Sequence, residues 1–222
     1  MTKILFFILT IQFFLSTNSL AVECSSLPVT PKITITSSYG KLTYDYSKNI
    51  SEITSMAKKF NLVETGLFAS GLSTVNVNFD ITINSIGHPI GNSEYCVIPS
   101  EIIIFLGLDK PTIYISKDLE KDSCEYKQVL HHEKIHQQIN KTTLEYYLPM
   151  FKKTSTEIIN KTKAIHSTSI DDIEKITGDL TRYYNKKLSP LVNFIKKEML
   201  SEQQKLDSPT NYLYESNLCQ TN

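Results

Sequence analysis

The residues best suited to metal chemistry lie in one short run: His132, Glu133 and His136, which form the pattern H-E-x-x-H. Histidines four positions apart lie one helical turn apart on the same face, so both imidazoles can bind one ion. The glutamate between them lies close enough to deprotonate a water molecule bound to that ion. The pattern predicts a helix-borne zinc site with Glu133 as general base, although three fixed positions also arise by chance.

The first 21 residues have the composition of a signal peptide. A basic Lys3 precedes the almost wholly apolar segment 4–15, and Ser19 and Ala21 are small residues at the two positions that a signal peptidase reads. The apolar run is too short to cross a bilayer, which takes about 20 residues. We therefore expect cleavage after residue 21 and an exported protein, periplasmic or secreted, that has no membrane partner once cleaved.

The charges of the chain are balanced, with 23 Lys and Arg against 23 Asp and Glu and no block of like charge. Nucleic acids and anionic membranes bind to strongly basic surfaces, so this composition argues against both as partners. A peptide or protein substrate is the partner that we expect.

Four cysteines in an exported chain indicate two disulfides, for which three pairings are possible. We expect Cys96–Cys124, which would connect the strand region to the start of the motif helix, and Cys24–Cys219, which would connect the two ends of the chain. Zinc held by cysteines is the alternative, but the chain contains no C-x-x-C pair.

Residues 22–121 have the pattern of a sheet lobe. Asn49 can cap one short helix that follows the second strand. The alternation of apolar and polar residues is clearest over 74–83, and shorter strands are expected at 32–36, 41–46, 94–98, 101–105 and 112–116. We therefore expect a small, mainly antiparallel sheet with one helix.

Residues 122–222 have the pattern of a helical lobe. A capping-box pattern predicts a long helix that begins near Ser123 and carries the motif, and a second predicts another helix from about Ser169 to about Leu206. Their short connection predicts an antiparallel helical hairpin. The expected fold class is α+β and zincin-like, with both lobes in one structural domain.

The hairpin brings carboxylates to the level of the motif. If its turn centres near Thr168, an equal rise along both arms places His132 opposite about Gln204. Three acidic residues then lie near the level at which a third ligand is required: Glu198, Glu202 and Asp207. Carboxylates beside two buried histidines would be costly without a cation, which favours a metal site.

Among the candidates for the third ligand, Asp207 ranks first and Glu202 second. Glu157 is a further rival, because it follows the motif at nearly the separation that thermolysin-like enzymes use. The alternative to a metal site is that His132 and His136 are core histidines satisfied by hydrogen bonds.

These features resemble a bacterial family of secreted zinc-dependent H-E-x-x-H proteases of largely unassigned function. The features in common are exported strands, a cysteine shortly before the motif, H-E-x-x-H itself and a long helical return, and the likeness runs from Tyr44-Asp45-Tyr46 to about Tyr212. That family ends in a Tyr-Asp-x-x-Thr-x-His-Gly signature, which corresponds to residues 206–213. Asp207 and Thr210 match it, whereas Tyr212 stands in place of the histidine. The resemblance implies a zincin-like hydrolase.

We therefore expect an exported, zinc-dependent metallopeptidase-like hydrolase in which Glu133 activates a metal-bound water. The alternative is a non-catalytic periplasmic or secreted protein-interaction module whose metal site is structural or vestigial. Four protein ligands would favour the module, whereas three ligands and an open position would favour the enzyme.

Overall fold

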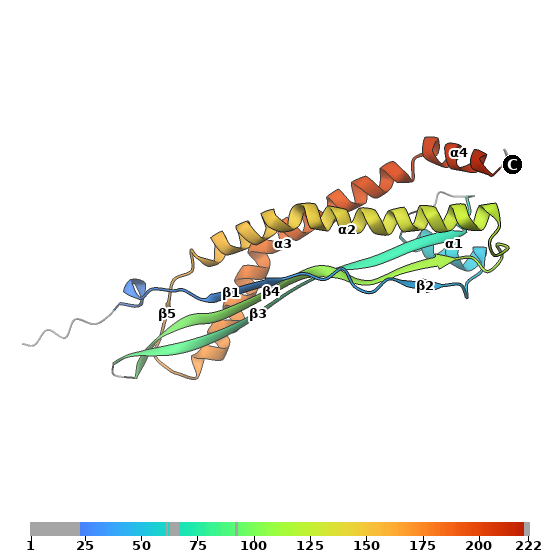
Figure 1. The fold of residues 1–222 in the computed structure, drawn as a ribbon. Coiled ribbons are helices and arrows are strands. Elements are labelled where there is room, and N and C mark those ends of the chain that lie inside the picture. The colour runs from blue at the N-terminus through green and yellow to red at the C-terminus, as the bar shows by residue number, and fades with distance from the viewer. Residues whose placement is uncertain (1–22, 61, 63–66, 92, 220–222) are drawn as a thin grey trace, which may run out of the picture.

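A computed structural model of the protein describes residues 23–60, 62, 67–91 and 93–219. Within these residues the chain forms an elongated α+β molecule with one mixed sheet and four α-helices (Figure 1). The predicted signal peptide, residues 1–21, lies outside the described residues.

Two very long strands form the frame of the sheet. β3 (Gly71–Gly91) and β4 (Glu94–Ile115) pair antiparallel over almost their whole length. At about 3.3 Å per residue, β4 extends for roughly 70 Å. Along its other edge lie β5 (Ile165–Ser167), β1 (Lys32–Thr36) and β2 (Thr43–Asp45), each of which pairs with a different part of β4.

The expectation of a mainly antiparallel sheet is wrong. β1 and β2 run parallel to β4, whereas β3 and β5 run antiparallel to it. The three strands expected between residues 94 and 116 fall within the single strand β4. Alternation of apolar and polar residues shows which face a side chain takes, but not the direction of the neighbouring strand. The parallel pairing therefore has no signal in that pattern.

The helices begin at recognisable caps. α1 (Ile50–Lys59) starts at Asn49, whose side chain accepts a hydrogen bond from the Glu52 backbone N–H while the Glu52 carboxylate accepts one from the Asn49 N–H. This capping box confirms the predicted short helix. α2 (Cys124–Ile159) begins next to Ser123, close to the predicted start, and the Ser123 side chain caps it.

The expected C-terminal hairpin of two helices is also wrong as a description of the fold. The connection between α2 and α3 (Asp172–Leu206) contains β5, which joins the sheet, and a further helix, α4 (Pro209–Leu218), follows α3. Both long helices pack against the β3–β4 ribbon (Figure 1), and they form one core with it. Ile104 of β4, Phe151 of α2 and Tyr184 of α3 are fully buried members of that core.

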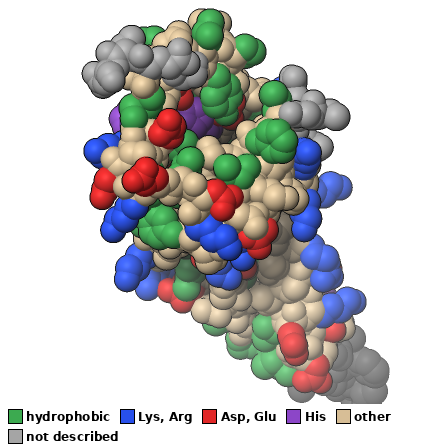
Figure 2. All heavy atoms as spheres, turned by 90° about the vertical axis from the view of Figure 1, so that its right-hand side faces the viewer, with side chains coloured by type: hydrophobic (Ala, Val, Ile, Leu, Met, Phe, Trp, Pro, Cys, Tyr) green, Lys and Arg blue, Asp and Glu red, His purple; other side chains and the backbone are tan. Residues whose placement is uncertain are grey.

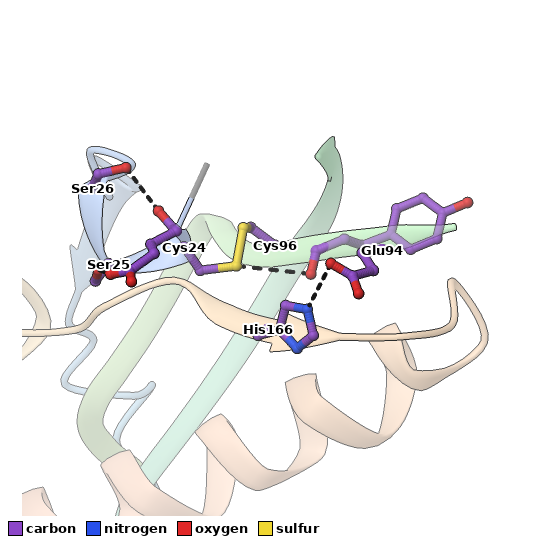
Figure 3. The surroundings of a disulfide bond; sticks show 8 residues. Cys24, Ser25, Ser26, Glu94, Cys96 and His166 are labelled. Carbon is purple, nitrogen blue, oxygen red and sulfur yellow. Dashed lines mark hydrogen bonds and ion pairs between the residues drawn. A yellow bond between two sulfur atoms is a disulfide. The ribbon is translucent and has the colours of Figure 1, made fainter. Parts of the chain in front are cut away.

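The disulfides join other pairs of cysteines than expected. Cys24 is bonded to Cys96, and Cys124 is bonded to Cys219. Cys96 is near the start of β4, whereas Cys124 follows its end, so the strand separates them by roughly 60 Å. Figure 3 shows the bond at the Cys96 end, where Nε2 of His166 on β5 lies 3.4 Å from Oε2 of Glu94.

Two disulfides are typical of proteins exported to oxidising compartments. None of the helices in the described part of the chain combines the length and the apolar composition needed to cross a bilayer.

Neighbouring isoleucines of β4 provide a test of this core. Ile104 is fully buried, whereas Ile103 is 37% exposed on the opposite face of the strand. We expect Ile104→Ala to lower the free energy of unfolding by about 2–5 kcal/mol, because it leaves a cavity, and Ile103→Ala to lower it by less than about 1 kcal/mol. Urea unfolding of both variants with the disulfides intact measures the difference, and equal losses would contradict the proposed core.

Candidate metal centre

Three atoms of the kind that bind metals meet at the end of the molecule where α2 begins and α3 ends. His132 and His136 lie in α2, and Asp207 is the C-cap residue of α3. Oδ1 of Asp207 lies 3.2 Å from Nε2 of His132 and 3.0 Å from Nε2 of His136. The two Nε2 atoms are 3.0 Å apart. The structure thus brings together the two motif histidines and the aspartate ranked first as third ligand.

The register of α2 against α3 determines which carboxylate reaches the histidines. His132 lies opposite Asp207. A turn centred on Thr168 predicts Gln204 at this place, so the observed register differs from the expected one by three residues. The connection contains β5, so the chain joins the sheet before it returns in α3.

Hydrogen bonds fix the orientation of both imidazoles. The amide nitrogen of Gln203 donates to the His136 backbone carbonyl at 3.0 Å and to Oδ1 of Asn140 at 2.9 Å, so its Oε1 faces Nδ1 of His136. Oε2 of Glu215, on α4, lies 2.9 Å from Nδ1 of His132. Both oxygens are acceptors, so each Nδ1 carries a hydrogen and each Nε2 is left to face Asp207.

This arrangement concentrates lone pairs at one point. Two Nε2 atoms and one carboxylate oxygen, all from buried or half-buried side chains, face one another. The Tyr212 phenol donates to the oxygen at 3.0 Å, but no hydrogen lies among the three atoms themselves unless an imidazole takes up a second proton. Burial alone would lower the pKa of His132 and His136. The hydrogen bonds to Asp207, together with the negative charges of the neighbouring carboxylates, outweigh burial and raise both pKa values. The Asp207 carboxyl is partly buried too, yet the same hydrogen bonds hold its pKa far below the ordinary range. The group therefore favours positive charge.

A zinc ion fits this set of donors. Two imidazole nitrogens and one carboxylate oxygen are a common catalytic zinc set, bound at about 2.0–2.2 Å. Tetrahedral ligand atoms at such distances lie roughly 3.3–3.4 Å apart, which is close to the separations of 3.0–3.2 Å found here. The residues present could hold the ion with one coordination position open.

Glu133 is buried beside the histidines, with only 6% of its surface exposed. Burial raises the pKa of its carboxyl to about 7, in spite of the opposing effect of His136 and His132. The first residue of β3, Gly71, makes room for it, because a Cβ at that position would lie 2.7 Å from Oε1 of Glu133 and 2.5 Å from Cγ1 of Val129. Backbone thus approaches the carboxyl more closely than a side chain would permit.

A cavity of about 370 Å³ opens beside this group. Glu133, His136 and Asp207 form part of its wall, and the facing wall comes from the end of α1 and the first residues of β3. In the end-on view of Figure 2, histidine side chains are visible among hydrophobic and acidic ones at this end. A molecule bound in the cavity would contact the group directly.

The two rival ligands lie elsewhere. Glu157 is exposed on α2, 21 residues beyond His136 in the same helix, which places it roughly 30 Å along the axis. Oε1 of Glu202 lies 2.6 Å from the Lys205 ammonium in a surface ion pair. His131, next to the motif histidine, is exposed.

Several residues of the site were not identified from the sequence. Gln203 and Glu215 hold the two imidazoles, and Gly71 admits the Glu133 carboxyl. Glu215 lies 83 positions from His132 and belongs to no local motif, so the sequence offers no signal for it. Gly71 could have been noticed as a glycine that precedes the clearest strand, where glycine often marks a close backbone approach.

No protein-family model, curated protein or solved structure matches this chain. The resemblance to secreted zinc-dependent proteases therefore remains an expectation from the sequence.

The raised pKa of Glu133 predicts a pH dependence of stability in the metal-free protein. The carboxyl has an ordinary pKa near 4.5 when unfolded and about 7 when folded, so the folded chain binds more protons between these values. The stability that this group contributes is present below pH 4.5 and is lost as the pH rises through 7. The loss is on the order of 3 kcal/mol.

Urea unfolding with a chelator present, at several pH values between 4 and 8, measures this loss for the wild type and for Glu133→Gln. The variant has no titrating group there, so the difference between the two unfolding free energies should change in its favour as the pH rises. Parallel curves would contradict the burial of an ionisable Glu133.

Proposed function

We propose that the protein is an exported zinc-dependent peptidase, periplasmic or secreted. The observation that supports this proposal is the convergence of His132, His136 and Asp207 beside the buried carboxyl of Glu133 at the wall of one cavity. Three protein ligands and an adjacent carboxyl are the arrangement of catalytic zinc sites, whereas structural sites have four protein ligands.

A bound zinc ion supplies a Lewis acid that polarises a carbonyl group and makes water more acidic. The protein supplies the proton acceptor. The Glu133 carboxylate is buried beside the two histidines, a place from which it can take a proton from the attacking water and then pass it to the leaving amine.

Tyr212 supplies a hydrogen-bond donor at the cavity wall. Its phenol donates to Oδ1 of Asp207 at 3.0 Å, and its ring stacks on His132 with a centroid distance of 5.3 Å. Burial and the negative charge of Asp207 raise the pKa of Tyr212 above its ordinary value, so the phenol keeps its hydrogen. A phenol that turns from Asp207 to the substrate can stabilise the negative charge that develops on the carbonyl oxygen.

The walls of the cavity indicate which peptides fit. Away from the acidic group it is lined by apolar side chains from α1, β3 and α3, among them Ala57, Phe60, Leu72, Val75 and Leu200. The edge of β3 that faces away from β4 pairs with no other described strand. An extended peptide can add to such an edge through its backbone while one side chain enters a pocket. We therefore propose a peptide with an apolar residue next to the cleaved bond.

The test of the proposed reaction is zinc content and peptide hydrolysis in the wild type and Glu133→Gln. We expect about one zinc per chain in both proteins, and turnover at least about 100-fold lower in the variant, because general-base catalysis contributes that much or more. His131→Ala, an exposed neighbour, should retain both properties. Absence of zinc from the wild type would contradict the proposal, whereas zinc with equal turnover in both proteins would contradict Glu133 as the base.

The preference for apolar residues can be tested with peptides that differ at one position beside the cleaved bond. We expect Leu or Phe to be preferred over Asp by at least about 10-fold in kcat/KM, because an apolar pocket disfavours a charge. Leu200→Glu places a carboxylate at the rim of the cavity and should reduce this preference. Ile170→Glu, at an exposed position before α3, should leave it unchanged. Equal cleavage of all peptides would contradict the apolar pocket.

A further inference from the structure

α4 is not held in place by a hydrophobic core. None of its side chains whose burial is described is buried, and Leu213 and Tyr214 are about two-thirds exposed. A helix of ten residues is also marginal in water without packing. The position of α4 therefore depends on a small number of particular contacts.

Those contacts are directed at the candidate metal centre. Oε2 of Glu215 lies 2.9 Å from Nδ1 of His132, and Oε1 of the same carboxylate accepts a hydrogen bond from the Asn211 amide at 3.0 Å. Tyr212 stacks on His132 and donates to Asp207. Beyond Glu215, α4 ends at Leu218, and its C-cap residue Cys219 is bonded to Cys124 at the first turn of α2.

We propose that α4 is a clamp, anchored by the disulfide Cys124–Cys219, through which Glu215 positions His132 to bind the metal. This inference rests on the zinc site of the proposed function. Glu215 is a positioning residue, because its carboxylate contacts the far side of the imidazole from Asp207.

Glu215 positions His132 in two ways. It accepts the Nδ1 hydrogen, so the lone pair for the metal stays on Nε2. It also fixes the rotation of the ring, because the carboxylate is itself held by Asn211 and is only 15% exposed. Partners of this kind raise the basicity of the ligand, and their loss typically weakens metal binding by about 10- to 100-fold.

The disulfide joins the same two helices as this hydrogen bond. Cys219 is one turn beyond Glu215 in α4, and Cys124 is roughly 12 Å before His132 along α2. At its other end α4 follows α3 through Ser208, whose side chain caps the helix. With both ends attached, Glu215 stays at a high effective concentration beside His132. Without the disulfide, α4 is attached covalently only at its start, and no side chain of described burial anchors it in the core. Its partly exposed contacts with the candidate metal centre then hold it, so α4 can move away more readily.

The test is the affinity for zinc(II), measured by competition with a chromophoric chelator. We expect Glu215→Ala to weaken binding by about 10- to 100-fold, and Glu215→Gln, which retains an acceptor oxygen, to recover most of the loss. The double variant Cys124→Ser/Cys219→Ser should weaken binding to a similar extent. The matched control Cys24→Ser/Cys96→Ser removes the disulfide at the opposite end and should leave the affinity unchanged.

A combined variant tests whether the disulfide acts through Glu215. If it does, adding Glu215→Ala to Cys124→Ser/Cys219→Ser should weaken binding little further, because the carboxylate has already left. Fully additive losses, an unchanged affinity in Glu215→Ala, or equal losses in both disulfide variants would overturn the clamp. If the variant without Cys124 and Cys219 does not fold, the comparison of Glu215→Ala with Glu215→Gln still decides the positioning role. A wild type that binds no zinc would overturn the proposed function together with this inference.

Discussion

The convergence of three lone pairs is the interaction on which the rest of this site depends. Nε2 of His132, Nε2 of His136 and Oδ1 of Asp207 lie 3.0–3.2 Å apart, and Nδ1 of each imidazole already faces another acceptor. Such a cluster repels itself unless positive charge lies among the three atoms. Protons on the imidazoles can supply that charge, as the raised histidine pKa values show, and a divalent cation can supply more of it. Glu133 and Glu215 further favour a positive charge at the site, because both place carboxyl groups beside the histidines.

The site lies at one end of the molecule because the long elements have matched lengths. β4 carries the chain from one end to the other, α2 carries it back over 36 residues, and α3 returns over 35. The third and fourth turns of α2, which carry His132 and His136, therefore lie at the same level as the C-cap of α3. Residues 75 positions apart in sequence become neighbours because two rigid helices of nearly equal length pack on one ribbon, and a change in the length of either would separate His132 from Asp207.

The sequence was most informative where the signal is local. Spacing within one helix identified the two motif histidines and Glu133, and Asn49, as a residue that favours N-cap positions, identified the start of α1. Equal rise along two helices placed Asp207 near the motif. This estimate needs only the position of the turn between the helices. Strand direction and disulfide pairing depend on contacts between distant segments, for which alternation and cysteine counts carry no information. Glu215 could not be recognised as a site residue for the same reason, because it contacts His132 only once α4 packs beside α2.

Tyr212 relates the sequence resemblance to the geometry. It stands where the similar family has a histidine, and in this fold that position lies at the site, against His132 and Asp207. A phenol whose pKa is raised by burial and by a carboxylate keeps its hydrogen and so is a poor ligand at neutral pH. It can instead donate a hydrogen bond. In the proposed zinc site, Asp207 is therefore the third ligand atom, and Tyr212 places a neutral donor beside the coordination position that three ligands would leave open.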